Sequence, residues 1–119
     1  MTSVVDCHCH LFPPSWAARG RMPVDMFDVD GLLERMDGAG VGVAIVSDPH
    51  IWYGDLDPCS IAATREWNDF AADLAREHSG RLVPLGTVTP WRGEDHVHEA
   101  ERALTELGLA GLAIPTSDR

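Results

Sequence analysis

The sequence predicts an α/β fold in which parallel strands alternate with helices in the order βαβαβαβ. Short apolar runs recur along the 119 residues, and the segments between them have apolar residues at helical spacing. The run at 41–47 is apolar almost throughout, which is typical of a strand buried on both faces of a parallel sheet. Right-handed helical crossovers are the usual connection between such strands.

Length, composition and charge limit the possible functions. With 45% hydrophobic and 24% charged residues, 119 residues suffice for one domain with its own core. A net charge of −10 without a basic cluster makes nucleic acid an improbable partner, and no apolar run is long enough to span a membrane. We therefore expect a small-molecule substrate. Because the start is unlike a signal peptide and the cysteines number three, we also expect a reducing cytoplasm.

Four strands and three helices are expected. The strands are the apolar runs at about 4–9, 41–47, 82–88 and 112–114. Asp28 or Asp30 is expected to cap the first helix, which ends at Gly38 or Gly40. Ser60 is expected to cap the second helix, which Gly80 closes, and the third helix runs from about 94 to 107. Pro84 weakens the third strand because proline donates no hydrogen bond to a sheet.

Apolar spacing also predicts which helix faces are buried. In the second helix the stripe is Ala63, Trp67, Phe70, Ala71 and Leu74. In the third helix we expect four residues to face inward: Val97, Ala100, Leu104 and Leu107. We expect three others to face water: Glu99, Arg102 and Glu106. His96 and His98 then lie in a solvated, acidic helix start.

The first strand ends in a pair of histidines, His8 and His10. Side chains alternate along a strand, so these imidazoles share a face with Asp6, while Cys7 and Cys9 point the other way as small core residues. Two imidazoles on one face can converge on a single divalent ion at about 2.0–2.1 Å per nitrogen. The alternatives are two polar residues that merely end a strand, or a zinc knuckle with the cysteines, which the alternation disfavours.

Other candidate site residues surround the histidine pair. Asp6 either orients an imidazole or hydrogen-bonds within the floor of a barrel. His50 either contacts substrate, transfers a proton, or is a solvated loop histidine. The loop aromatics either line a pocket for a flat substrate or cover the core: Phe12, Trp16, Trp52 and Tyr53. These candidates follow the carboxyl ends of predicted strands, where barrel enzymes place their sites, and this favours a barrel over an open sheet.

The motif Asp6-x-His8-x-His10, followed by Phe12-Pro13-Pro14, resembles the opening of the amidohydrolase-related metal-dependent hydrolases. The nearest branch is that of aminocarboxymuconate-semialdehyde decarboxylase and the resorcylate-type decarboxylases. Further similar segments follow in the family's order, at 33–41, 44–47, 68–70, 80–86 and 104–112. The resemblance implies the N-terminal half of a TIM (β/α)8-type barrel. Residues 1–119 would form a single partial domain with the first four strands and three helices.

The same resemblance implies the chemistry. His8 and His10 are expected to hold one divalent metal ion, for which zinc is the expected element. The expected reaction is hydrolysis, or non-oxidative decarboxylation, of a small carboxylate or cyclic substrate. The family's remaining ligands, a histidine and an aspartate after later strands, fall beyond Arg119. The catalytic residues therefore stay unknown, and we expect no activity without the missing half.

Three interpretations of the chain follow from this. It is a truncated or split enzyme whose barrel a complementary chain or a homo-oligomer completes. Alternatively, it is a non-catalytic half-barrel that serves as a partner or scaffold subunit. TatD-type deoxyribonucleases also open with D-x-H-x-H-L, so a metal-dependent nuclease is a further alternative, although the acidic charge counts against it.

Overall fold

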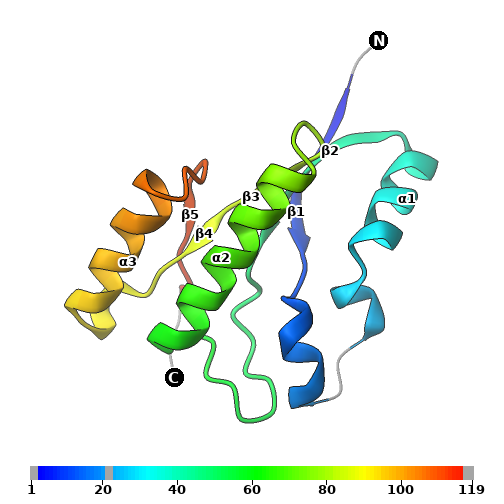
Figure 1. The fold of residues 1–119 in the computed structure, drawn as a ribbon. Coiled ribbons are helices and arrows are strands. Elements are labelled where there is room, and N and C mark those ends of the chain that lie inside the picture. The colour runs from blue at the N-terminus through cyan, green and yellow to red at the C-terminus, as the bar shows by residue number, and fades with distance from the viewer. Residues whose placement is uncertain (1–2, 21–22, 117–119) are drawn as a thin grey trace.

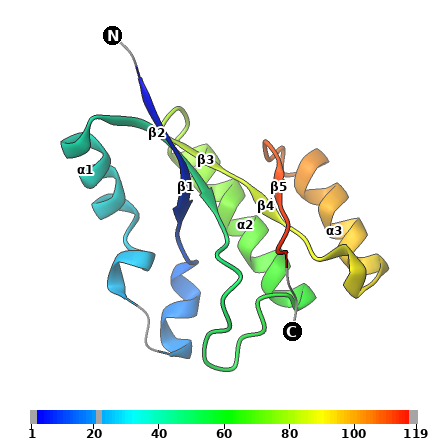
Figure 2. The same cartoon turned by 180° about the vertical axis from the view of Figure 1, so that it is seen from behind.

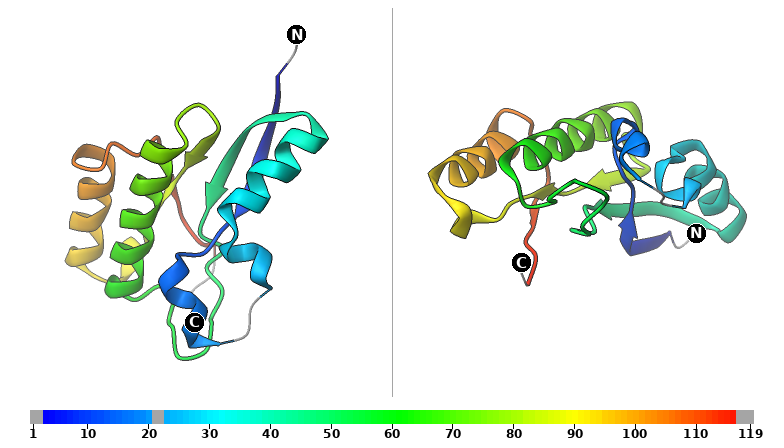
Figure 3. Two further views of the ribbon diagram at one scale, coloured as in Figure 1. Left: turned by 45° about the vertical axis from the view of Figure 1, so that its right-hand side comes forward. Right: turned by 90° about the horizontal axis from the view of Figure 1, so that it is seen from below.

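Helices α1, α2 and α3 cover one face of a sheet of parallel strands (Figure 1). The structure is a computed structural model that describes residues 3–20 and 23–116. Viewed from behind, the strands lie in front of the helices (Figure 2), and the view from below shows the described helices on one side of the strands (Figure 3). The predicted alternation of parallel strands and helices is confirmed.

The strands are β1 (Val4–His10), β2 (Val41–Ser47), β3 (Leu82–Pro84), β4 (Gly86–Thr87) and β5 (Leu112–Ala113). The first three form one sheet in the order β1-β2-β3, and β4 pairs with β5. The predicted third strand is therefore divided at Leu85. Pro84 has no N–H to donate, and the chain changes partner directly after it. The Leu85 N–H donates to Val46 O (2.8 Å), whereas the Gly86 N–H donates to Gly111 O (2.9 Å).

The helices are α1 (Val29–Ala39), α2 (Ile61–Glu77) and α3 (Glu94–Thr105). Two of the predicted caps are confirmed, since the Asp28 carboxylate accepts from the Gly31 N–H (2.9 Å) and the Ser60 hydroxyl from the Ala63 N–H (3.2 Å). Gly40 ends α1 in the left-handed region, with φ 73°. The loops contain short 3₁₀ turns, η1 (Pro14–Arg19), η2 (Val24–Phe27) and η3 (Pro90–Arg92). None of the helices within 3–20 and 23–116 is both long and apolar enough to cross a bilayer.

The core lies between the helices and the sheet. The predicted stripe of α2 packs there, with Trp67 and Ala71 fully buried and Phe70 packed against them. Trp67 also donates its indole N–H to Leu85 O (3.0 Å), the residue at which the third strand divides. The hydrogen bond satisfies a polar group that would otherwise be buried without a partner.

The predicted orientation of α3 is wrong in part, although Glu106 is exposed and Leu107 packs against the core as expected. Val97 and Leu104 are 43% and 45% exposed, whereas Glu99 is buried at 2%. Glu99 accepts hydrogen bonds from Arg102 Nε (2.7 Å) and Nη2 (2.9 Å) and from Asn68 Nδ2 (2.9 Å). Burial alone would raise the pKa of Glu99, but these donors outweigh it and lower the pKa. A charged residue with several hydrogen-bond donors is therefore buried, and two apolar residues that were expected to face inward are exposed.

Strand β1 forms an edge of the sheet, and much of it is exposed. Val4 and Val5 are 51% and 53% exposed. Cys7 is also exposed, so its predicted place in the core is wrong, whereas Cys9 is partly buried and packs against the core. At the other edge, beyond β5, Ile114 is 54% exposed. Apolar side chains thus remain uncovered on β1 at one end of the row of strands and beyond β5 at the other end.

Replacement of Gly54 by alanine is expected to destabilise the fold by about 2 kcal/mol or more, because the position is strained and crowded. Gly54 has φ 61°, and a Cβ there would lie 2.1 Å from the Arg19 carbonyl oxygen. Gly40→Ala is the matched control, because Gly40 has a similar φ of 73° but open space around it. Urea denaturation of both variants measures the difference, and equal losses of stability would contradict the steric account.

Candidate functional site

The loops that follow β1, β2 and β4 all leave the carboxyl-terminal ends of the strands, on one side of the molecule (Figure 1). His8 and His10 lie at this end of β1. The pairing of β1 with β2 is irregular between Asp6 and Cys9, where three steps on β1 match two on β2 (Ala44 to Val46). Irregularities of this kind redirect side chains and are frequent beside functional sites.

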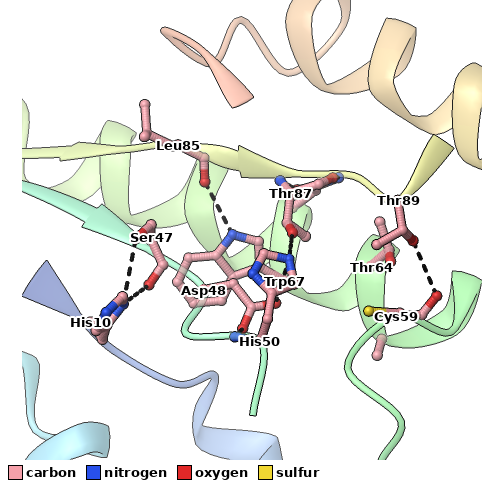
Figure 4. Close-up of polar contacts among 12 residues, drawn as sticks. His10, Ser47, Asp48, His50, Cys59, Thr64, Trp67, Leu85, Thr87 and Thr89 are labelled. Atoms are coloured by element: carbon pink, nitrogen blue, oxygen red, sulfur yellow. Dashed lines mark hydrogen bonds and ion pairs between the residues drawn. The ribbon is translucent and has the colours of Figure 1, made fainter. Parts of the chain in front are cut away.

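The two imidazole rings meet. Nε2 of His8 lies 3.1 Å from Nε2 of His10, and the ring planes cross at 83° with centroids 4.6 Å apart. His10 is fixed from its other side, because its Nδ1 lies 2.9 Å from Ser47 O at the end of β2 (Figure 4). A carbonyl only accepts, so Nδ1 carries the proton and Nε2 presents its lone pair toward His8.

The separation of the two nitrogens fits a shared metal ion. With metal–nitrogen bonds of about 2.0–2.1 Å, angles between octahedral and tetrahedral separate two ligand nitrogens by about 2.9–3.4 Å. The 3.1 Å between His8 and His10 lies inside that range. Without a metal, the same distance suits a hydrogen bond in which the His8 N–H donates to His10. A cation that bound between the two Nε2 atoms would therefore replace the proton that they share.

Two nitrogens do not complete a metal site. Within the described residues no group of three or more histidine, cysteine, aspartate or glutamate side chains is placed to hold an ion. The Asp6 carboxylate contacts the main chain, because its Oδ1 accepts from the N–H of His8 (3.0 Å). This contact supports the backbone of β1 between Asp6 and His8.

Asp48 is a site residue that the sequence reasoning missed. It follows β2 directly and is 3% exposed. Its Oδ1 accepts from the His50 N–H (2.9 Å), while Oδ2 is buried without a hydrogen-bond partner in the described part of the chain. Burial raises the pKa of the Asp48 carboxyl, and the charges of His50 and His10 offset part of that rise. An aspartate straight after a buried strand was the available signal.

His50 is held in place by its neighbours. Its Nε2 contacts Thr87 Oγ1 at the end of β4 and lies 4.0 Å from Asp48 Oδ2 (Figure 4). The side chain is 11% exposed, so the alternative of a solvated loop histidine does not describe it. Its backbone has φ 54°, the one positive value among the described non-glycine residues.

The remaining candidates divide between core and surface. Phe12 and Trp16 are buried in the core cluster, where Phe12 stacks on Tyr53, so they cover the core rather than an open pocket. Trp52 is 44% exposed in the loop after β2 and stays a candidate for substrate contact. His96 is buried and its Nδ1 lies 3.1 Å from Thr89 Oγ1, so its predicted solvation is wrong. His98 is exposed as expected.

No protein-family model matches the chain, and no curated protein matches it either. Solved structures do match. An amidohydrolase II protein superposes with a TM-score of 0.79 at 23% identity, over 98% of this chain and 41% of its own length. A 2,6-dihydroxybenzoate decarboxylase from Rhizobium gives a TM-score of 0.73 at 19% identity, over 100% and 40%.

A 5-carboxyvanillate decarboxylase from Novosphingobium aromaticivorans, solved with bound manganese, gives a TM-score of 0.74 at 19% identity, over 97% and 42%. The chain thus spans about two fifths of the length of the structures that it matches. Element order, parallel pairing and these superpositions agree with one another. The chain has the fold of the N-terminal half of an amidohydrolase-type (β/α)8 barrel.

Proposed function

We propose that this chain is the metal-binding N-terminal part of an enzyme of the amidohydrolase-related family. Its reaction would be the non-oxidative decarboxylation of a small aromatic or unsaturated acid, or the hydrolysis of a related cyclic substrate. The observation that carries this proposal is the convergence of His8 and His10 at 3.1 Å at the carboxyl end of β1. The decarboxylases among the matching structures support the choice of substrate class.

The residues of this chain would have distinct parts in that reaction. His8 and His10 would hold one divalent ion through their Nε2 atoms, and Ser47 would keep His10 in the required tautomer through Nδ1. The bound ion would supply Lewis acidity that polarises an oxygen of the substrate. Trp52, exposed in the loop after β2, would contact a flat substrate. The further metal ligands would come from outside the described residues.

We propose zinc or manganese as the ion. Imidazole nitrogen is a common ligand of zinc, which supports zinc as the ion. Manganese is bound in two of the matching decarboxylase structures, which supports it as the alternative. We also propose the cytoplasm as the location, since Cys7 and Cys9 are free thiols.

Further βα units are proposed to complete the barrel, either on additional polypeptide or through another copy of the chain. The exposed apolar residues at both edges support this, with Val4 and Val5 on β1 and Ile114 beyond β5. Val97 and Leu104 on α3 add an apolar face where the next helix of a barrel would pack. Unpaired edge strands are themselves sites for association.

The test is turnover by the chain alone and in a completed barrel. We expect no turnover of 2,6-dihydroxybenzoate or 5-carboxyvanillate by residues 1–119 alone. We expect metal-dependent release of CO₂ once four further βα units are supplied, and its loss on His8→Ala. His98→Ala is the control, because His98 is exposed on α3. Undiminished CO₂ release by the His8→Ala variant would contradict the proposed role of the pair.

A non-catalytic half-barrel is the second candidate function. The absence of a three-ligand group among the described residues supports it. In that case the chain associates through its exposed apolar edges, but it retains no metal and releases no CO₂ when the barrel is complete. The same experiment therefore separates the two candidates.

A further inference from the structure

We propose that the open side of α3 docks a helix of a partner polypeptide, in which lysine or arginine residues flank an apolar stripe. The proposal rests on the proposed function, which packs the next helix of a barrel on this side. It adds the chemistry of that helix, and it assigns the position to a partner rather than to a second copy of this chain.

In the described chain, α3 has a neighbouring α-helix on one side only. It lies at the end of the row of helices, beside α2 (Figures 1 and 3). Glu99 of α3 accepts a hydrogen bond from Asn68 of α2 (2.9 Å). Arg102 of α3 pairs with Asp69 of α2 at 2.8 Å. These contacts define the side of α3 that faces α2, and the opposite side is open.

The open side carries the exposed apolar residues of α3. Val97 and Leu104 are 43% and 45% exposed, and a separation of seven residues places them on one stripe of the helix. At about 100° per residue, Val97 lies about 160° around the helix axis from Glu99, and Leu104 lies equally far from Arg102. The apolar stripe therefore points away from α2, toward the position that a following helix would occupy.

Two glutamates border this stripe. Glu101 lies between Val97 and Leu104 along the same face, and Glu94 lies three residues before Val97. Both glutamates are exposed, and neither forms an ion pair with another residue of the described ranges. Carboxylates on a docking helix would place like charges together here, whereas lysine or arginine would pair with the two glutamates.

The arginines of the described chain are engaged elsewhere or lie far from this face. All nine basic residues of the sequence are arginines. Six of the seven in the described ranges pair with aspartates or glutamates away from the stripe: Arg19, Arg65, Arg76, Arg81, Arg92 and Arg102. The seventh, Arg35, belongs to α1 at the other end of the row of helices (Figure 1). The positive charge that this face accepts is therefore supplied by the partner.

Charge also argues against a second copy of the chain on this face. A head-to-tail copy would bring α1 of one molecule to α3 of the other. α1 has three acidic residues against one arginine, and α3 has four acidic residues against one arginine. A symmetric contact between two α3 helices would instead set Glu101 against Glu101. Both arrangements bring like charges together, in molecules that each carry a net charge of −10.

The test is the binding of two synthetic helical peptides to the full chain, measured by fluorescence anisotropy at low ionic strength. The peptides share one leucine stripe and differ in the flanking residues, which are lysine in one and glutamate in the other. We expect the lysine peptide to bind at least about tenfold more tightly, with an advantage that shrinks as salt is added. Equal affinities, or no binding of either peptide, would overturn the proposal.

Matched variants show whether the peptide binds at α3. Glu101→Lys should weaken binding of the lysine peptide about tenfold, because it replaces attraction by repulsion within the stripe. Glu77→Lys is the control, since Glu77 is exposed at the end of α2 and the change in net charge is the same. It should have little effect. Equal losses of affinity in the two variants would show that only the overall charge attracts the peptide, and would overturn the proposal.

Leu104→Ala tests the apolar contact and the second copy in one protein. It should weaken binding of the lysine peptide about fivefold, because it removes apolar area from the contact. Sedimentation of the chain without peptide should be the same for Leu104→Ala and the wild type. If the wild type self-associates and Leu104→Ala does not, a second copy occupies this face and the proposal is overturned. Neither metal nor substrate is used, so its failure is distinguishable from a failure of His8 and His10 to bind metal.

Discussion

Replacement of His10 by alanine is expected to lower the affinity of the protein for Mn²⁺ or Zn²⁺ by at least about 100-fold, more than the usual effect of losing a supporting group. The His10 ring supplies one of the two converging nitrogens, and its hydrogen bond to Ser47 O (2.9 Å) fixes the direction of the lone pair. Isothermal titration calorimetry of the wild type, of His10→Ala and of a control variant, His98→Ala, measures the effect.

The control decides whether the effect is specific. His98 lies exposed on α3, far along the chain from the β1 pair, so its loss should leave the affinity unchanged. Ser47→Ala should have little effect too, because the principal acceptor for His10 Nδ1 is the Ser47 main-chain oxygen. If His10→Ala and His98→Ala bind the ions equally well, the two imidazoles do not form the metal site.

Replacement of Asn68 by alanine is expected to destabilise the fold by about 3 kcal/mol, because it leaves several buried polar groups without partners. Its side chain serves the main-chain N–H and carbonyl of Thr87 and an oxygen of Glu99. Glu99 would remain buried and charged with one donor fewer. Urea denaturation followed by circular dichroism measures the loss.

Asp69→Asn is the matched control on the neighbouring residue of α2. Asp69 is largely exposed and pairs with Arg102 at 2.8 Å, so the change should cost less than about 1 kcal/mol. Equal losses of stability in the two variants would contradict the importance of the buried network. So would a Thr87 amide that exchanges no faster in the Asn68→Ala protein.

Local patterns predicted the alternation of strands and helices well. The apolar run of β2, the caps Asp28 and Ser60, and the stripe of α2 around Trp67 all depend on neighbours within a few residues. The convergence of His8 and His10 also follows from position in one strand. Such features can be predicted from the sequence because the interactions that stabilise them are local.

The failures have a common cause in contacts between distant segments. The buried face of α3 is set by Glu99, whose partner Asn68 lies 31 residues earlier. The division of the third strand depends on β5, with which β4 pairs. His50 is fixed by Thr87, 37 residues away. Spacing along a helix or strand carries no information about these partners.

The exposure of Cys7 has a different origin. Alternation along β1 places it on the face opposite to His8, and that inference assumed that something covers the face. In the described chain β1 is an edge strand, and of its two cysteines only Cys9 packs against the core. A pattern of side chains indicates direction but not whether a neighbouring element is present.

The measurement that tests the central claim most directly is the broadening of histidine ring signals by paramagnetic Mn²⁺ in NMR spectra of the protein. If His8 and His10 share one ion, substoichiometric Mn²⁺ removes both of their ring signals together while the His98 signal persists. Loss of one signal without the other, or equal broadening of His98, would contradict a shared ion.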